Sequence, residues 1–306
     1  MVNRIGLVGV GLVGTAIAER LFAKGFNVVG FDVNSAKRQH LAQLGGNAVG
    51  SPAEVAQQAN RIVLSLPDTQ IVREVVEGPD GLLQANPAIY CGANRLTPPS
   101  LWRGYIVDTT TGDPDETVAL ALRLADRGVY FLDAAISGSS RQVRNGQAVF
   151  MVGGDRTAFE ACADIFEAIT EKVFYLGPSG SGSKAKLASN LILGLNRLAL
   201  AEGLVFAGKL GLDLQTFLEL LKVTPAYSAA MDSKGKKMLS RDFTPEARIR
   251  QHYKDVSLIL KYAEKASQEL PLSRVHLDIL ENAMAAGNGE MDNSAIIREI
   301  ERRRKL

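Results

Sequence analysis

Short apolar runs alternate with segments of helical periodicity over roughly the first 175 residues of the chain. The apolar runs, rich in β-branched residues, predict strands at 4–10, 27–31, 61–66, 105–108, 130–133 and 148–152. Helical periodicity predicts helices between several of them, at 15–24, 35–44, 71–76 and 115–126. Because strand and helix alternate, this part is predicted to form a parallel, doubly wound α/β sheet.

After Gly177 the pattern changes, and almost all of the remaining chain has helical periodicity. A long predicted helix begins near Lys184, and three prolines, Pro225, Pro245 and Pro271, punctuate the later ones. We therefore expect two domains, an α/β domain at 1–177 and an all-helical domain at 178–306. The proline-containing segment 84–103 has no clear period and is predicted to be a surface insertion.

The composition is that of an ordinary globular protein, with 46% hydrophobic residues, 22% charged residues and a formal net charge of +2 among 306 residues. Nothing in this balance indicates a nucleic-acid partner, since the basic tail 302–305 is typical of a solvated helix end. Two isolated cysteines predict neither a disulfide framework nor a metal site. Without a signal peptide, and with polar residues interrupting the apolar stretch 187–212, the chain is expected to be cytoplasmic and not membrane-bound.

A glycine-rich turn joins the first predicted strand to the first predicted helix. Gly9 permits a tight turn, Gly11 lets the backbone approach a pyrophosphate, and Gly14 allows close packing of helix on strand. The helix N-terminus beyond supplies free N–H groups for phosphate. The sequence therefore predicts a Rossmann-type dinucleotide site, with the whole loop as cofactor-binding residues: Gly9, Val10, Gly11, Leu12, Val13 and Gly14.

Asp32 ends the second predicted strand, 18 positions after Gly14, where a ribose-binding carboxylate is expected. A carboxylate there accepts hydrogen bonds from the ribose 2′-hydroxyl and repels a 2′-phosphate. Lys37 and Arg38 lie nearby and weaken that preference. NAD is the expected cofactor, and NADP remains open.

Four ordered motifs give the chain a wider resemblance. The first runs Asp133-Ala134-Ala135-Ile136-Ser137-Gly138-Ser139, followed by Gly146 and Met151-Val152-Gly153-Gly154. The second is Gly180, Gly182, Lys186 and Asn190 in the register G-x-G-x-x-x-K-x-x-x-N, the third is Lys254-Asp255, and the fourth is Asp292-Asn293-Ser294-Ala295. In these motifs the chain resembles the β-hydroxyacid dehydrogenase family, which includes 3-hydroxyisobutyrate dehydrogenase and tartronate semialdehyde reductase.

The resemblance implies that Lys186 and Asn190 are catalytic residues. Four positions apart on one predicted helix, they project from the same face. A lysine beside a bound nicotinamide can take the proton of the substrate hydroxyl while hydride leaves the carbon. Burial and a cationic ring nearby would both disfavour its ammonium form. Asn190 would hold the substrate hydroxyl or Lys186.

Other site residues follow from the same match of positions. Ser137 and Gly138, after an apolar strand, would bind the substrate carboxylate. Cofactor contacts are implied at two strand ends and on one later helix, by Leu66, Pro67, Thr110, Thr111 and Lys254.

The sequence also departs from the family pattern. Ala135 stands where the family has proline, and Ser139 where it has glycine. Arg141 and Arg144 occupy a loop that the family usually builds from small residues. One hypothesis is that Arg141 or Arg144 recognises a second anionic group on the substrate.

The predicted function is hydride transfer between NAD and a small 3-hydroxy acid, such as 3-hydroxyisobutyrate, or the corresponding semialdehyde. An imine or ketone reductase and a non-catalytic NAD-binding protein are the alternatives, although relatives of both kinds commonly lack the lysine present at 186. An enzyme of the 6-phosphogluconate type would need a larger helical domain. The resemblance also implies a homodimer or homotetramer.

Overall fold

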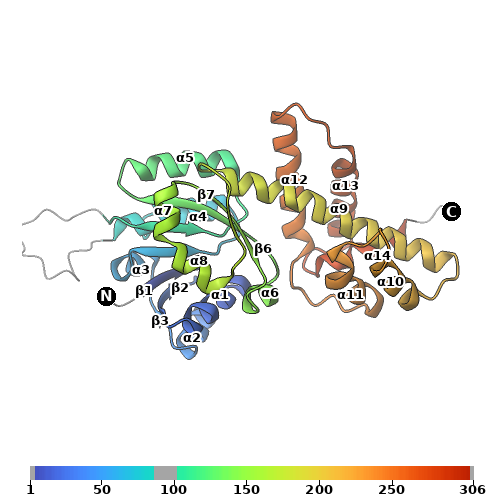
Figure 1. Ribbon diagram of the computed structural model, residues 1–306, viewed down its shortest axis with the longest axis horizontal. Helices are drawn as coiled ribbons and strands as arrows, with labels where there is room; N and C mark the ends of the chain where they lie inside the picture. The colour runs from blue at the N-terminus through green and yellow to red at the C-terminus, as the bar shows by residue number, and fades with distance from the viewer. Residues whose placement is uncertain (1–3, 86–101, 304–306) are drawn as a thin grey trace, which may run out of the picture. The chain divides into compact units, whose positions relative to one another are not determined.

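The computed structural model describes residues 4–85 and 102–303, so most of the predicted insertion 84–103 lies outside the described residues. The chain forms two compact units, Met1–Lys186 and Leu187–Leu306. They divide inside helix α9 (Ser181–Lys209), nine residues after the boundary predicted at Gly177. Figure 1 shows the strands in the first unit and helices throughout the second.

The first unit is built on a sheet of eight strands in the order β3-β2-β1-β4-β5-β6-β7-β8. Their bounds are β1 Arg4–Val8, β2 Asn27–Phe31, β3 Asn47–Ala48, β4 Arg61–Leu64, β5 Tyr105–Asp108, β6 Tyr130–Ser137, β7 Val149–Gly153 and β8 Val173–Tyr175. The sequence did not predict β3 and β8. The chain winds outward from β1 in both directions, so the order reverses between β1 and β4. In open α/β sheets ligands bind at such a switch point, outside the carboxyl ends of the strands.

One part of the fold prediction is wrong. The sheet is only mostly parallel, because β7 pairs antiparallel to β6, with Asp133 opposite Gly153 and Ser137 opposite Val149. The connection between these two strands contains only one short helix, α6 (Ser140–Arg144). A crossover to a parallel neighbour needs a dozen or more residues, so this short connection favours antiparallel pairing.

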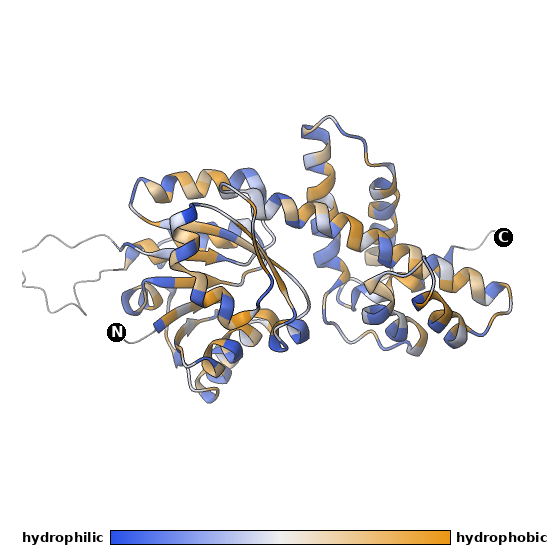
Figure 2. Cartoon of the chain, viewed as in Figure 1, coloured by the Kyte–Doolittle hydropathy of each residue, from blue (hydrophilic) through white to orange (hydrophobic). Residues whose placement is uncertain are grey.

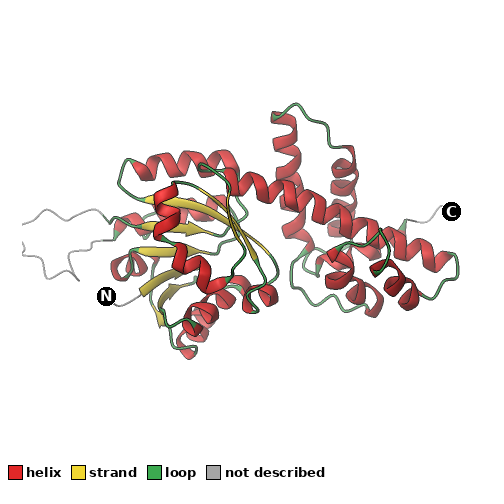
Figure 3. Ribbon diagram, viewed as in Figure 1, coloured by secondary structure: helices red, strands yellow, loops and turns green. Residues whose placement is uncertain are grey.

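Helices cover both faces of the sheet, and alternate residues of each strand point to opposite sides. Ile5, Leu7 and Val63 pack with one set of helices, whereas Val8 and Ile62 pack with the other. The first set is α1 (Leu12–Ala23), α2 (Ser35–Gln43), α6, α7 (Arg156–Ala161) and α8 (Ala163–Ile169), and the second is α3 (Pro52–Gln58), α4 (Thr69–Glu77), α5 (Pro114–Ala125) and the 3₁₀ turn η1 (Leu82–Gln84). Figure 3 shows this layering. The buried faces fix which strand ends can reach a ligand.

The second unit packs further helices with most of the length of α9 around one apolar core. They are α10 (Leu214–Lys222), the π-helical η3 (Met231–Gly235), α11 (Lys236–Ser240), α12 (Ile249–Lys265), α13 (Pro271–Ala285), η4 (Asn293–Ala295) and α14 (Ile296–Arg302). Leu204, Ile259 and Ile279 are among the residues of the buried interior. Figure 2 shows apolar and polar residues interspersed along these helices, as expected for amphipathic elements.

Helix α9 is apolar and long enough to cross a membrane by length and composition, which corrects the expectation that no window in this stretch qualifies. It also carries Lys186, Asn190 and Arg197, each of which is buried. Polar and ionisable side chains on one helix face are costly in hydrocarbon, so these residues favour a helix packed inside a folded protein.

Candidate functional site

The glycine loop has the backbone that a dinucleotide requires. Gly9 has φ +93°, a conformation that favours glycine. A Cβ atom at Gly14 would overlap the carbonyl oxygen of Gly9, whereas one at Gly11 would meet no atom within 4 Å. The fold itself thus requires glycine at 14 and leaves space at 11. Open space beside the backbone at the start of α1 fits a pyrophosphate drawn close to the N–H groups.

Asp32 lies directly beside this loop. Its Oδ2 accepts a hydrogen bond of 2.8 Å from the backbone N–H of Val10, and its Oδ1 accepts one of 2.9 Å from Asn34. Arg38 donates to the backbone carbonyl of Asp32 at 2.6 Å. A carboxylate has about four acceptor sites, so Asp32 retains capacity for a ribose hydroxyl.

The two strand ends predicted to contact the cofactor meet each other. The N–H of Leu66, after β4, donates to Thr110 Oγ1, after β5, at 3.3 Å. A Cβ at Gly9 would overlap the carbonyl oxygen of Ser65, so the glycine loop packs directly on the end of β4. Pro67 and Thr111 are the next residues along each connection. The structure therefore gathers the glycine loop, Asp32, Leu66 and Thr110 around the β1–β4 switch point.

Ser137 and Gly138 end β6 and turn into α6. Gly138 has φ +146°, and Ser139 then caps α6 by accepting from the N–H of Gln142. Arg141 and Arg144 are both exposed, and Arg144 is paired with Glu19, Nε to Oε2 at 2.6 Å. Among residues 4–85 and 102–303, Arg141 makes no ion pair, so the two arginines differ in this respect.

The start of α9 is held by Asp133, a buried carboxylate on β6. Its oxygens accept from the N–H groups of Gly180 at 2.9 Å and of Ser183 at 2.8 Å. Burial raises the pKa of Asp133, while these backbone hydrogen bonds act in the opposite direction. A Cβ at Gly182 would overlap the carbonyl oxygens of Asp133 and Met151. Strands β6 and β7 thus hold the first turn of α9 by hydrogen bonds and close backbone packing.

Lys186 follows this anchored turn by one further turn of helix, and only 8% of the residue is exposed. Anchoring the backbone three residues before Lys186 limits where its amine can point. The motif that contains Asp133 did not predict this role for it. A charged residue inside an otherwise apolar strand was the available signal, because such a residue is buried only when its oxygens have partners.

A second group of predicted residues lies in the helical unit. The Nδ2 of Asn190 donates to Asp255 Oδ2 at 3.0 Å, and Lys254 Nζ lies 3.7 Å from Asp255 Oδ1. Asn190 comes from α9, and the other two come from α12. The structure therefore brings Asn190 and Lys254 to one carboxylate, Asp255, to which sequence analysis gave no role.

Comparison with known proteins agrees with this geometry. Residues 4–177 match the family model described as the NAD binding domain of 6-phosphogluconate dehydrogenase. Residues 180–300 match the model described as NAD-binding of NADP-dependent 3-hydroxyisobutyrate dehydrogenase. Both models describe NAD(P)-binding dehydrogenase domains, and together they cover nearly the whole chain.

Individual relatives match over almost their full length. A 2-(hydroxymethyl)glutarate dehydrogenase of Eubacterium barkeri is 31% identical over 96% of this chain and 94% of its own. A 2-hydroxy-3-oxopropionate reductase of Escherichia coli (strain K12) is 30% identical over 97% of both chains. The crystal structure of a 3-hydroxyisobutyrate dehydrogenase from Salmonella typhimurium has the same fold, with a TM-score of 0.84, 24% identity and coverage of 96% of this chain and 99% of that one.

The motifs, the switch-point geometry and the full-length matches thus agree, and the NAD(P)-binding loop has the glycines and the acidic partner that such a site needs. The chain belongs to the β-hydroxyacid dehydrogenase family, whose members are NAD(P)-dependent oxidoreductases acting on the CH–OH group of hydroxy acids.

Proposed function

We propose that this enzyme transfers a hydride between NAD and a small 3-hydroxy acid, or the corresponding semialdehyde, with Lys186 as general acid and base. The observation that carries the proposal is the placement of Lys186, buried one turn beyond the Asp133-anchored start of α9. An anchored helix start favours a fixed position for the amine, as proton transfer to a reacting oxygen requires.

Each residue has a distinct part in the oxidation. The nicotinamide cofactor, when bound, accepts the hydride that leaves the hydroxyl-bearing carbon. Lys186 takes the hydroxyl proton, so that the C–O single bond becomes a carbonyl. Asn190, four residues further along α9, orients the oxygen, and Ser137 and Gly138 bind the substrate carboxylate. In the reverse direction Lys186 returns the proton.

We assign NAD as the preferred cofactor because Asp32 lies beside the glycine loop. A carboxylate at that place attracts a ribose hydroxyl and repels a 2′-phosphate. Arg38 donates to the backbone carbonyl of Asp32 and stacks near the Phe31 ring, 5.8 Å from its centroid. Because it lies so close, the preference for NAD is expected to be moderate.

A substrate screen tests the proposed function. Purified protein is incubated with short 2- and 3-hydroxy acids and with NAD or NADP, and the reduced cofactor is followed by absorbance. Turnover of a 3-hydroxy acid with a higher kcat/KM for NAD than for NADP is expected. Turnover of cyclic imines but of no hydroxy acid, in assays run toward reduction, would contradict the proposal, as would binding of cofactor without turnover of any substrate.

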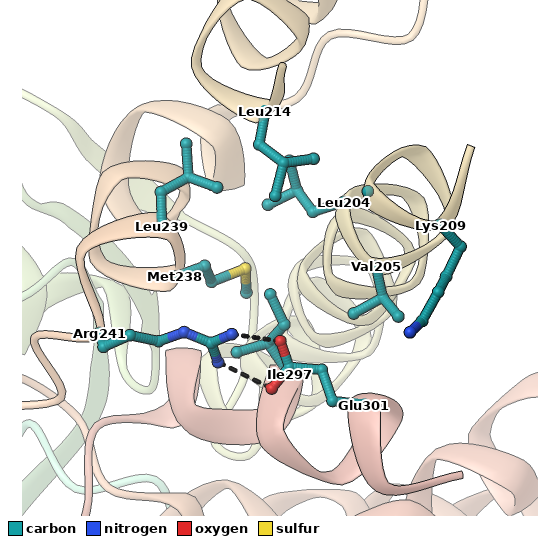
Figure 4. A pocket seen from close by; sticks show the side chains of 10 residues that line it. Leu204, Val205, Lys209, Leu214, Met238, Leu239, Arg241, Ile297 and Glu301 are labelled. Atoms are coloured by element: carbon teal, nitrogen blue, oxygen red, sulfur yellow. Dashed lines mark hydrogen bonds and ion pairs between the residues drawn. The ribbon is translucent and has the colours of Figure 1, made fainter. Parts of the chain in front are cut away.

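We also propose that copies of the chain associate through α9 as a homodimer or homotetramer, in the cytoplasm. Ile192 and Phe206 on α9, and Leu210 directly after its last residue, lie on one face by helical spacing and are each at least 60% exposed. Near the end of α9 lies a cavity of about 380 Å³, lined by Leu204, Leu214, Met238 and Ile297 and edged by the Arg241–Glu301 ion pair (Figure 4). A neighbouring copy offers apolar side chains that can fill it.

Light scattering coupled to gel filtration tests this assembly. The expected mass is two or four times that of one chain, and the F206E/L210E double variant should shift it toward the monomer. A monomeric wild-type protein at micromolar concentration would overturn the assignment.

A further inference from the structure

One face of α9 carries a row of polar and small residues into the helical unit. Asn190, Gly194 and Arg197 follow one another at spacings of four and three, so they lie on the same side of the helix. Asn190 is 6% exposed and Arg197 is 5% exposed. Buried polar groups of this kind need partners, and the partners lie on α12 and α13.

Gly194 allows these helices to come close. A Cβ atom at Gly194 would overlap the Nε2 of His252 on α12 and would lie 2.8 Å from the Cε1 of His276 on α13. The two imidazole rings are buried, with centroids 5.0 Å apart. The close approach brings Asp255, one turn after His252 on α12, to Asn190.

The hydrogen bond between Asn190 and Asp255 fixes which end of the amide faces which way. A carboxylate only accepts hydrogen bonds, so the NH₂ end of Asn190 must face it, as the 3.0 Å distance from Nδ2 to Oδ2 shows. The carbonyl oxygen, Oδ1, then points away from Asp255.

Asp255 is buried, with 6% of its surface exposed, so its charge needs compensation within the unit. Arg197 supplies part of it. Burial lowers the pKa of Arg197 to about 10, while Asp292 and Asp255 oppose that change. Burial, and then the charge of Arg197, lower the pKa of His276 to about 4, which keeps this imidazole neutral at pH 7. The positive charge nearby therefore belongs to Arg197 and, at 3.7 Å, to Lys254.

We propose that Asp255 is a positioning residue that sets the orientation of the Asn190 amide, so that Asn190 presents a hydrogen-bond acceptor to the reacting side. The inference rests on the proposed function, in which Asn190 orients the oxygen that reacts. An acceptor there receives a hydrogen bond from the substrate hydroxyl or from the amine of Lys186, both of which are donors. An amide turned the other way would present NH₂ and could not accept either hydrogen bond.

Asp255→Asn tests this with almost no change of shape. Two amides can pair in either orientation, so the variant no longer fixes Asn190. We expect kcat to fall about tenfold, because a charge-assisted hydrogen bond is replaced by a neutral one, while the KM for NAD changes little. In the N190A/D255N double variant the loss should equal that of N190A alone. An exposed carboxylate on the same helix provides the control, and Glu264→Gln should leave kcat unchanged.

A second variant covers the case in which Asp255→Asn does not fold. Asn190→Asp places a second carboxylate beside that of Asp255, and the two negative charges repel each other. We therefore expect a lower kcat for this variant than for N190A. Adding Asp255→Asn to it should restore activity severalfold by returning an amide–carboxylate pair.

Wild-type kcat in Asp255→Asn, or losses that multiply in the double variant, would overturn the inference. If Lys186→Ala and N190A both keep wild-type turnover, the proposed function itself fails. If both are slow while Asp255→Asn is not, only the positioning role of Asp255 fails.

Discussion

Lys186→Ala is expected to lower kcat by about 10²- to 10⁴-fold while the dissociation constant for NAD stays close to that of the wild type. The variant removes the group that takes the hydroxyl proton, an interaction made in the transition state and not in cofactor binding. Stopped-flow or steady-state rates, together with NAD titration by fluorescence, separate the two effects.

Lys184 provides the matched control. It lies on the same helix two residues earlier and is exposed, so Lys184→Ala should leave both kcat and NAD affinity unchanged. Lys186→Met keeps most of the side-chain volume and should be as slow as the alanine variant if the lost amine, and not a cavity, is responsible. Normal turnover in either Lys186 variant would remove the role assigned to this residue.

Asp292→Ala is expected to lower the free energy of unfolding of the helical unit by about 3–5 kcal/mol, the cost of removing one member of a buried ion pair. Asp292 is fully buried, and its Oδ1 lies 2.9 Å from Lys234 Nζ. Its oxygens also accept from the backbone N–H groups of Glu246, Ala247 and Ser294. Urea unfolding followed by circular dichroism measures the loss.

The contribution of Asp292 should depend on pH in a defined direction. Burial alone would raise its pKa, but Lys234 and the backbone N–H groups outweigh burial, and the net pKa is lowered. A lowered folded pKa means that the stabilisation is complete above the unfolded value of about 3.9 and is lost as pH falls through the folded pKa. The wild type and Asp292→Ala should therefore differ constantly from pH 7 to about 5 and converge in stronger acid.

The exposed Asp278 on α13 is the control for Asp292. Asp278→Ala should change stability by no more than a few tenths of a kcal/mol, as is usual at surface positions. An equal loss in both variants, or none in Asp292→Ala, would show that the buried ion pair does not stabilise the unit.

The local sequence pattern was enough to predict those elements whose secondary structure depends mainly on their own residues. The strands at 27–31 and 105–108 have the predicted bounds, because both are apolar runs that end at turns or polar residues. The glycine loop was equally readable, since positions 9 and 14 are dictated by local backbone geometry. Strand β8 was not predicted because it has only three residues, none of them fully buried. Its pairing with β7 also joins residues that are far apart in the sequence.

The part of the candidate site that the sequence did not predict depends on contacts between residues far apart in the chain. Asp133 meets its partners 47 and 50 positions away, and Asp255 meets Asn190 at a separation of 65. No periodicity within one helix or strand encodes such a pairing. Only a motif match drew attention to these carboxylates, and it did not say what they hold.

The open space at Gly11 has a consequence for the evolution of this scaffold. The folded chain has room for a side chain at position 11 but not at position 14. A substitution at 14 would therefore disturb the fold, whereas a substitution at 11 would disturb cofactor binding alone. A descendant that keeps glycine at 14 but acquires a bulky residue at 11 would retain the architecture while abandoning the dinucleotide. The residues at positions 11 and 14, considered separately, would distinguish homologues that still bind the dinucleotide from homologues that keep only the fold.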